Sequence, residues 1–143
     1  MKIAIGSDHG GYELKEYLKP FIEEMGHELI DVGCFSRDSV DYPEQARAVT
    51  VLVKRGEADR GILICGTGIG MSIAANRTAG IRAALCHELF TARMSRLHND
   101  SNVLCMGGRV IGPGLALEMV RLWLVTSFEG GRHKRRLGLI DPA

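Results

Sequence analysis

Aromatic side chains are scarce in this chain, and neither sign of charge dominates it. Phenylalanine, tryptophan and tyrosine make up 6% of the 143 residues, and 18 lysines and arginines stand against 17 aspartates and glutamates, for a net charge of +1. Proteins that bind nucleic acids carry a marked basic excess, often with aromatic platforms for the bases. The composition therefore argues against a nucleic-acid partner, although residues 132–136 form one local basic cluster.

Long apolar runs are also absent. No run approaches the roughly 20 residues that a helix needs to cross a bilayer. Met1-Lys2 leads directly into Ile3-Ala4-Ile5, without the apolar segment of a signal peptide. We therefore expect no membrane partner and a cytoplasmic location.

The four cysteines, Cys34, Cys65, Cys86 and Cys105, include no C-x-x-C pair. That absence excludes a zinc ribbon and a thioredoxin-type motif, and free thiols in a reducing compartment are the simplest interpretation. No group of cysteine, histidine or acidic residues has the sequence spacing of a metal site, so we expect neither a metal nor another cofactor. Cys34, Cys86 and Cys105 are expected to be packing thiols.

What the chain does have is a regular alternation of apolar runs with amphipathic stretches. With 45% apolar and 24% charged residues, it has the composition of one globular domain, residues 1–143. The pattern predicts strands at residues 2–6, 28–32, 61–65, 81–86 and 102–106, and helices at 12–25, 41–56, 88–97, 113–125 and from Met71 onward. Pro20 argues against one unbroken first helix. The alternation predicts a parallel sheet with helices on both faces.

Three polar loops follow predicted strands directly: Ser7-Asp8-His9-Gly10-Gly11, Gly66-Thr67-Gly68-Ile69-Gly70 and Gly107-Gly108-Arg109. In a parallel sheet such loops lie beyond the carboxyl ends of the strands, where ligands bind. Their positions predict one site that is assembled from segments far apart in the sequence.

Cys65 ends the third apolar run and opens the glycine-rich loop. Backbone N–H groups at the start of the following helix favour anions and stabilise a thiolate, so Cys65 is a candidate reactive group. The loop lacks the lysine of a P-loop, the glycine spacing of a dinucleotide fingerprint and the arginine of a cysteine phosphatase, whose position Met71 occupies. A tight turn with an inert buried thiol is an equal alternative.

Two further polar groups could supply acid–base chemistry. In Asp8-His9, the histidine could hold a phosphate or move a proton; the alternative is that Asp8 caps the next helix. His98, in His98-Asn99-Asp100, could be a general acid or base, or a cation at a helix C-terminus. In a parallel sheet the start of strand five lies at the edge opposite the end of strand three. His98 should therefore be remote from Cys65, and it is either uninvolved or supplied by a second subunit.

Arg132 and Arg136, four residues apart, would project from one face of a helix, where two guanidinium groups suit a phosphate. The alternative is a solvated basic tail. Arg109, after the last polar loop, is a third candidate. The remaining histidines have no supporting pattern and are expected to be surface or structural residues: His27, His87 and His133.

Together these segments resemble the type B ribose-5-phosphate isomerases and the wider family that includes galactose-6-phosphate isomerase. No single motif is sufficient, but the ordered set covers nearly the whole chain and is specific. The motifs are Gly6-Ser7-Asp8-His9-Gly10-Gly11, Asp41-Tyr42-Pro43, Ile62-Leu63-Ile64-Cys65-Gly66-Thr67-Gly68, Ser72-Ile73-Ala74-Ala75-Asn76, Gly80-Ile81-Arg82-Ala83-Ala84, His98-Asn99-Asp100, Gly108-Arg109-Val110 and Gly130-Gly131-Arg132-His133.

The resemblance implies a Rossmann-like three-layer α/β/α fold with a five-stranded parallel sheet. It also implies a homodimer, or a tetramer of two dimers, with active sites shared between subunits, which would account for a remote His98. The implied reaction is the interconversion of ribose 5-phosphate and ribulose 5-phosphate through a cis-enediolate, without metal or cofactor, in the pentose phosphate pathway. The alternative substrate is a hexose 6-phosphate such as galactose or allose 6-phosphate, and the alternative function is a non-catalytic anion- or nucleotide-binding module.

By position in the family motifs, Cys65 resembles the base that moves a proton between C2 and C1, and His98 the group that opens the sugar ring. Asp8 would assist at ring and hydroxyl oxygens, and Thr67 would hydrogen-bond the thiolate or a substrate oxygen. Some family members use a glutamate near the loop instead of the cysteine, but Ser72 offers no carboxylate here. The implied phosphate ligands, completed by a basic tail at about residues 130–143, are His9, Arg109, Arg132 and Arg136. The other implied substrate contacts are Tyr42, Asn99, Gly66, Gly68, Ile69 and Gly70.

Overall fold

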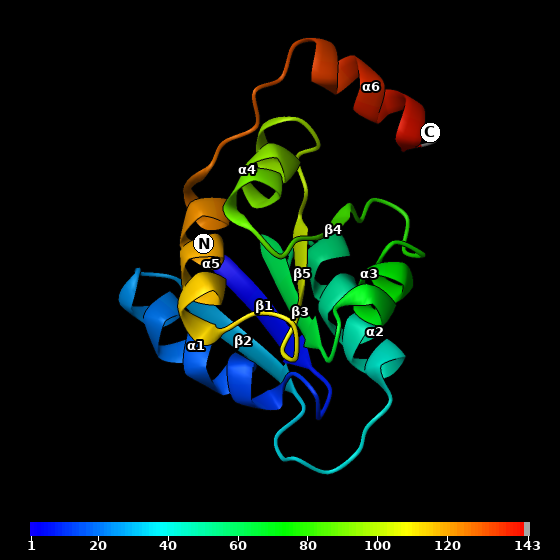
Figure 1. Ribbon diagram of the computed structural model, residues 1–143. Helices are drawn as coiled ribbons and strands as arrows, with labels where there is room; N and C mark the ends of the chain where they lie inside the picture. Colours follow the sequence, from blue (N-terminus) through cyan, green and yellow to red (C-terminus); the bar gives the residue numbers. More distant parts are fainter. Residues whose placement is uncertain (142–143) are drawn as a thin grey trace.

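A five-stranded sheet in the order β2-β1-β3-β5-β4 forms the centre of the molecule (Figure 1). The structure is a computed structural model and describes residues 1–141. Its strands are β1 (Lys2–Ser7), β2 (Glu28–Gly33), β3 (Arg60–Cys65), β4 (Ala83–Leu85) and β5 (Val103–Gly107). Each neighbouring pair of strands is parallel. The parallel five-stranded α/β fold predicted from the sequence is confirmed.

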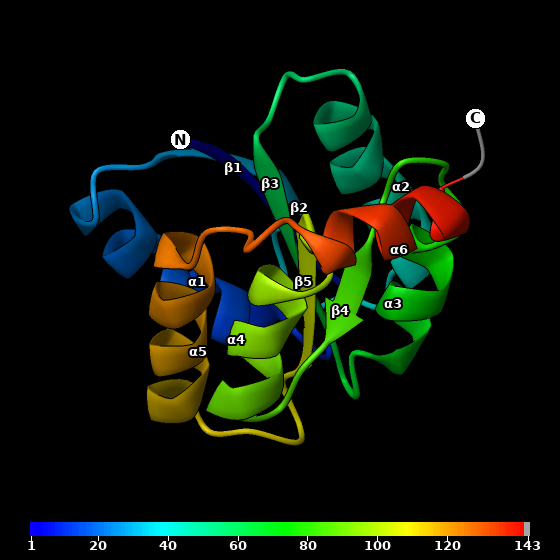
Figure 2. The same ribbon diagram turned by 90° about the horizontal axis from the view of Figure 1, so that it is seen from above.

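Helices cover both faces of this sheet, as Figure 2 shows from above. Side chains of α1 (Tyr12–Glu24), α4 (Leu89–Leu97) and α5 (Pro113–Val125) join one apolar cluster, and those of α2 (Tyr42–Lys54) and α3 (Ile69–Ala75) join the other. The result is the expected three-layer arrangement. Across residues 1–141, none of the helices has both the length and the apolar character needed to span a bilayer.

The alternation of side chains along β3 feeds both clusters. Ile62 and Ile64 belong to the first cluster, whereas Leu63 and Cys65 belong to the second, because successive side chains of a strand face opposite sides of the sheet. All four are buried. Covered on both faces, the strand is apolar throughout, and Cys65 ends it on the side of α2 and α3.

β4 is shorter than the sequence suggests. A strand is predicted over residues 81–86, whereas β4 contains only Ala83–Leu85. Ile81 instead ends a turn, in which its N–H donates to the carbonyl of Thr78 over 3.1 Å. Its side chain is buried in the second cluster, so its apolar character reflects packing against α2 and α3 rather than a place in the strand.

Two helices also differ from expectation at their ends or interior. α1 is unbroken although it contains Pro20, so the expected interruption is wrong. Pro20 lies on the exposed side of α1, where water can solvate the carbonyl that loses its N–H partner. α3 begins at Ile69 rather than Met71. Gly68 is its N-cap residue and has a φ of 77°, a left-handed conformation that favours glycine, so the chain is helical from the next residue on.

α6 (Arg132–Ile140) lies outside the two helix layers that cover the sheet. It follows Gly130 and Gly131, whose φ values of 73° and 57° redirect the chain after α5. Figure 1 shows α6 at the end of the molecule opposite the carboxyl ends of the strands. His133 and Leu137 are the buried residues of this helix. The basic segment expected at about residues 130–143 is therefore helical over Arg132–Ile140, with its arginine and lysine side chains exposed; residues 142–143 lie outside the described part of the chain.

Candidate active site

The three polar loops meet at the carboxyl edge of the sheet, because β1, β3 and β5 are neighbours. The N–H of Gly108 donates to the carbonyl of Cys65 over 2.8 Å, and the N–H of Arg109 donates to that of Gly66 over 3.0 Å. A Cβ on Gly108 would lie 2.7 Å from the carbonyl oxygen of Gly10, so this approach requires glycine. The loops thus lie together as predicted from the strand order, and their role in binding stays a prediction.

Cys65 is buried at the end of β3, with 5% of its surface exposed. Its Sγ accepts a hydrogen bond from the N–H of Gly68 over 3.1 Å. A backbone donor aimed at sulfur stabilises negative charge there more than it stabilises a neutral thiol. The backbone donor expected beside Cys65 is therefore present, and the reactive role of this thiol stays a prediction.

The glycine-rich loop is held by close contacts on two sides. A Cβ on Gly107 would lie 2.7 Å from the backbone of Thr67, and a Cβ on Gly70 would lie 2.6 Å from the ring of Tyr42. Within the loop, Thr67 Oγ1 accepts the N–H of Ile69 over 3.2 Å. Tyr42, at the start of α2, thus covers the loop from the side opposite β5.

Asp8 and His9 form the turn between β1 and α1. Asp8 is 7% exposed, and its Oδ1 accepts the N–H groups of Gly10 and Gly11 over 2.9 and 3.2 Å. Asp8 thus closes the turn before α1 rather than capping the helix, because Gly11 is the N-cap residue of α1 and no side chain caps it. His9 Nδ1 accepts the N–H of Val40 over 3.3 Å, so the neutral ring carries its proton on Nε2 and can donate it to an anion.

Arg109 covers the same loop from the end of β5. A Cβ on Gly66 would lie 3.3 Å from Arg109 Nη1, so the guanidinium group lies against this glycine. The side chain is otherwise exposed, and its fork of N–H donors matches a phosphate or carboxylate. His9 and Arg109 thus bring two anion-binding groups to the edge of the sheet that carries Cys65.

The remaining predicted site residues lie at the other end of the molecule. The register of β3 and β5 pairs Gly61 with Val103 and Cys65 with Gly107. The chain before Val103 is therefore about 13 Å from Cys65 along the strands. That part of the chain carries His98, the residue that ends α4, so the predicted separation of His98 from Cys65 is confirmed. The predicted contacts that share this end are Asn99, Arg132 and Arg136.

His98 contacts a histidine of α6. The rings of His98 and His133 stack with their centroids 4.2 Å apart and 12° between their planes. Nε2 of each ring lies 3.8 Å from Oε2 of Glu129. Burial lowers the pKa of His133, and the positive charges of His98 and Arg132 lower it further. His133 is 6% exposed, so it is not a surface residue, and its isolated place in the sequence gives no sign of this stack.

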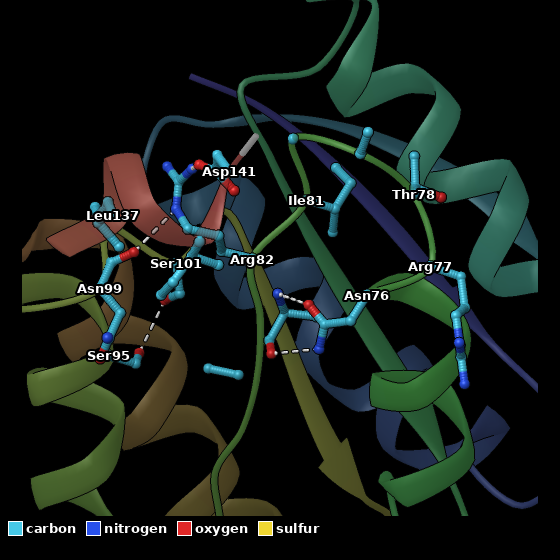
Figure 3. Close-up of a pocket in the computed structure, with 15 residues that line it drawn as sticks. Asn76, Arg77, Thr78, Ile81, Arg82, Ser95, Asn99, Ser101, Leu137 and Asp141 are labelled. Atoms are coloured by element: carbon cyan, nitrogen blue, oxygen red, sulfur yellow. Dashed lines mark hydrogen bonds and ion pairs between the residues drawn. The ribbon is translucent and has the colours of Figure 1, made fainter. Parts of the chain in front are cut away.

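A cavity of about 590 Å³ lies at this end, between α6 and the segment that leads into β4 (Figure 3). Arg82 lies at its side: Nε donates to the carbonyl oxygens of Asn99 and Asp100, and the guanidinium group pairs with Asp141. None of the lining residues belongs to the three loops. The cavity is thus separate from the surroundings of Cys65 within one chain.

His87 supports the last of the three loops. β4 ends at Leu85, so it offers no backbone acceptor to the N–H of Gly107; Nε2 of His87 accepts this N–H instead, over 3.0 Å. His87 is therefore one of the expected structural residues, with a specific task at the candidate site. The only sequence signal for it is its position directly after the predicted fourth strand.

The sequence and the fold match those of known sugar-phosphate isomerases. The family described as ribose/galactose isomerase matches residues 3–140. Ribose-5-phosphate isomerase B of Escherichia coli K12 is 51% identical over 97% of this chain and 93% of its own length, and a D-erythrulose-4-phosphate isomerase of Pectobacterium atrosepticum is 42% identical over 92% and 87%. The structure of ribose-5-phosphate isomerase B from Clostridium thermocellum superposes with a TM-score of 0.97 at 55% identity, covering 99% of this chain and 95% of that one. The chain belongs to the ribose/galactose isomerase family.

Proposed function

We propose that this protein interconverts ribose 5-phosphate and ribulose 5-phosphate through a cis-enediolate. The observation that carries the proposal is the hydrogen bond from the Gly68 N–H to Cys65 Sγ, at the edge of the sheet where three loops meet. Family membership supports isomerase chemistry. The name of the Escherichia coli relative supports the five-carbon substrate.

In this proposal Cys65 is a proton carrier and forms no covalent bond to the sugar. The thiolate takes the proton from C2 of the open-chain aldose and returns it to C1. The intermediate carries one negative charge, which passes from the oxygen of C1 to that of C2 as the hydroxyl proton moves from O2 to O1. The N–H groups of residues 66–70 are fixed donors for that charge, since Tyr42 and the backbone of Gly107 leave the loop little room to move. Thr67 adds a hydroxyl group to the same loop.

The phosphate group is assigned to positively charged side chains away from the reacting carbons. His9 and Arg109 contribute from the chain that carries Cys65, and Arg132 and Arg136 contribute from α6 of a second copy. Binding at the phosphate then aligns C1 and C2 with the thiolate, so that remote binding energy lowers the barrier to proton transfer.

A second copy is part of the proposal because Cys65 lies at the carboxyl ends of the strands, whereas His98 lies near the amino end of β5. In a homodimer, two-fold symmetry would build two equal sites, each with the loops of one chain and α6 of the other. Exposed apolar side chains on α3 and α6, such as Ile73 and Leu139 at 55% and 79% exposure, support a contact between copies. A tetramer would repeat this dimer.

Ring opening is assigned to His98, with Asp8 at the ring and hydroxyl oxygens and Asn99 at a sugar hydroxyl. Opening a furanose ring requires a proton for the ring oxygen and a base for the C1 hydroxyl. A histidine suits this step because it exchanges protons near neutral pH.

Two observations favour a wider substrate range for the same chemistry. The family description includes galactose isomerases, and one relative is named for a four-carbon sugar phosphate. A hexose 6-phosphate such as galactose or allose 6-phosphate presents the same carbonyl end and the same phosphate, separated by one more carbon. Substrate choice then depends on the distance between the loop and the phosphate ligands.

The test is the ratio kcat/KM measured for ribose 5-phosphate, allose 6-phosphate, galactose 6-phosphate and erythrulose 4-phosphate on one preparation. We expect the highest value for ribose 5-phosphate. A higher value for another sugar would replace the substrate assignment. Tight binding of a nucleotide, with no turnover of any sugar phosphate, would replace the isomerase by a non-catalytic binding module.

A further inference from the structure

His98, Glu129 and His133 bring three potential metal ligands to one point. Their side-chain ligand atoms all lie within 4.8 Å of one another, and both imidazole Nε2 atoms face the same Glu129 oxygen at 3.8 Å. Two imidazole nitrogens and one carboxylate oxygen are a common donor set of zinc sites that keep a position open for water. Glu129 and His133 are close in the sequence, at positions i and i+4, but His98 belongs to the end of α4, so the sequence alone does not bring the three residues together.

His133 supplies an independent indication of a ligand. Its side chain is 7% exposed, and within residues 1–141 its Nε2 is a buried atom without a hydrogen-bond partner, although it points toward Glu129. Buried polar atoms are nearly always paired, so an unpaired one marks a place where a ligand or ion fits.

We propose that His98, Glu129 and His133 bind one divalent transition-metal ion of the Zn²⁺ class, and that the bound ion inhibits the isomerase by withdrawing His98 from the sugar. The metal-binding part stands on contacts within a single chain. The inhibition part rests on the proposed function, in which His98 opens the sugar ring.

Binding of an ion requires the stacked rings to part. The ring planes are 12° from parallel, whereas the lone pairs of two imidazoles must converge on one ion. His98 is 39% exposed and can tilt, while the packed His133 stays in place. The positive charges of Arg132 and Arg136 oppose a cation, but both side chains are exposed, so water and salt screen them. The tilt that completes the site is also the movement that takes His98 out of its catalytic position.

Co²⁺ is a suitable probe, because its absorption spectrum identifies its ligands. Titration of the full chain should give visible bands of nitrogen- and oxygen-bound Co²⁺, saturating at one ion per chain, without the near-ultraviolet charge-transfer band of a Co²⁺–thiolate bond. Glu129→Gln and His133→Asn should each weaken binding by about tenfold or more. Matched controls are Glu118→Gln and His27→Asn, which alter a glutamate and a histidine elsewhere on the molecule.

Three outcomes would overturn the site. They are no Co²⁺ binding, a thiolate charge-transfer band that places the ion at a cysteine, or equal binding by wild type and Glu129→Gln. Glu129 is 57% exposed, so its variant should stay folded even if His133→Asn does not, and thermal melts of both variants verify this. Retention of the spectrum in Cys65→Ala would support the site.

The inhibition part is read from isomerase assays with added Zn²⁺. Zn²⁺ should lower kcat in the wild type, EDTA should restore it, and Glu129→Gln should need about tenfold more Zn²⁺ for the same relative loss. Equal sensitivity of both proteins would refute inhibition through this cluster. A chain that isomerises no sugar phosphate would refute the proposed function, while the Co²⁺ spectrum would still decide on the site.

Discussion

The imidazole of His87 accepts the N–H of Gly107 over 3.0 Å, at the point where β5 turns toward Arg109. Gly107 in turn touches the backbone of Thr67, and the N–H of Arg109 donates to the carbonyl of Gly66. His87 therefore holds the loop after β5 in register with the loop after β3, from a position outside both loops.

Replacement of His87 should separate this positioning role from simple packing. His87→Leu leaves the Gly107 N–H without its acceptor, which should cost about 1–3 kcal/mol of unfolding free energy, and it should lower kcat more than it raises KM. His87→Gln offers an amide oxygen as acceptor and should recover most of the loss. Urea unfolding and steady-state kinetics measure both effects, and equal kcat in the two variants would contradict the role.

Cys65→Ala should abolish proton transfer while leaving the sugar phosphate bound. Removal of a general base lowers kcat by about 10²–10⁴-fold, and the binding of a non-reacting phosphate-bearing inhibitor should change little. Cys105→Ala is the control: this thiol belongs to the same apolar cluster as Cys65 but is fully buried, and burial raises its pKa. An active Cys65→Ala enzyme would rule out the thiolate as base.

Mixing two inactive variants tests whether sites are shared between chains. In a heterodimer of Cys65→Ala and His98→Asn chains, one site contains both mutations and the other contains none. Random pairing of equal amounts should therefore restore about a quarter of wild-type activity. Each variant alone is the control, and mixtures that stay inactive after verified subunit exchange would show that Cys65 and His98 do not act in one site.

Gly70 should tolerate a side chain only if Tyr42 is made smaller. A Cβ at Gly70 would lie 2.6 Å from the Tyr42 ring, so Gly70→Ala should destabilise the protein by about 1–3 kcal/mol through overpacking. Adding Tyr42→Ala should reduce the penalty of Gly70→Ala, a coupling that a double-mutant cycle of unfolding free energies measures. Additive effects would show that the loop can move away from the ring.

Acid should remove the contribution of Asp31 to stability. Asp31 Oδ2 lies 2.7 Å from Lys15 Nζ and 2.8 Å from Lys19 Nζ, and the Lys15 side chain is fully buried. Burial by itself would raise the pKa of Asp31, but hydrogen bonds from both lysines and from the Gly33 N–H outweigh it and lower the pKa. A carboxyl with a lowered folded-state pKa stabilises the fold above its unfolded value of about 3.9, and loses that contribution as the pH falls through the folded pKa.

The matching variant is Asp31→Asn. It leaves Lys15 charged and buried with Glu16 as its remaining partner, and should cost about 3 kcal/mol near neutral pH. Urea unfolding in a pH series should show the gap between wild type and variant closing in acid. Glu118→Gln, which removes an exposed ion pair with Arg121, should show almost no gap at any pH.

The sequence was sufficient for the architecture because each buried strand is an apolar run bounded by glycine or polar residues. Ile62 and Ile64 on one face and Leu63 and Cys65 on the other illustrate this pattern. The same reasoning placed the three loops at one edge and His98 at the other, since parallel strands all point the same way. It failed where an apolar residue packs outside a strand, as Ile81 does, and where a proline lies on an exposed helix face, as Pro20 does.

The pattern of apolar and polar residues does not predict the contacts of individual side chains. The stack of His98 on His133 depends on how α6 returns toward α4 after Gly130 and Gly131, and neither residue type nor spacing encodes that path. The hydrogen bond from Gly107 to His87 depends on how early β4 ends. The catalytic and binding roles of Cys65, His98 and the arginines stay predictions, because they concern a substrate and a second chain.

The two glycines before α6 have a consequence for how this protein can change over evolutionary time. Neither apolar cluster includes a residue of α6, so the helix that carries Arg132 and Arg136 is joined to the rest of the fold mainly through a turn and a few side chains. Mutations on its outer face can therefore adjust charge and reach without disturbing the packed interior. If Arg132 and Arg136 bind the phosphate as proposed, a lineage can exchange one phosphorylated sugar for another by altering this helix, while the sheet and its two apolar clusters are inherited unchanged.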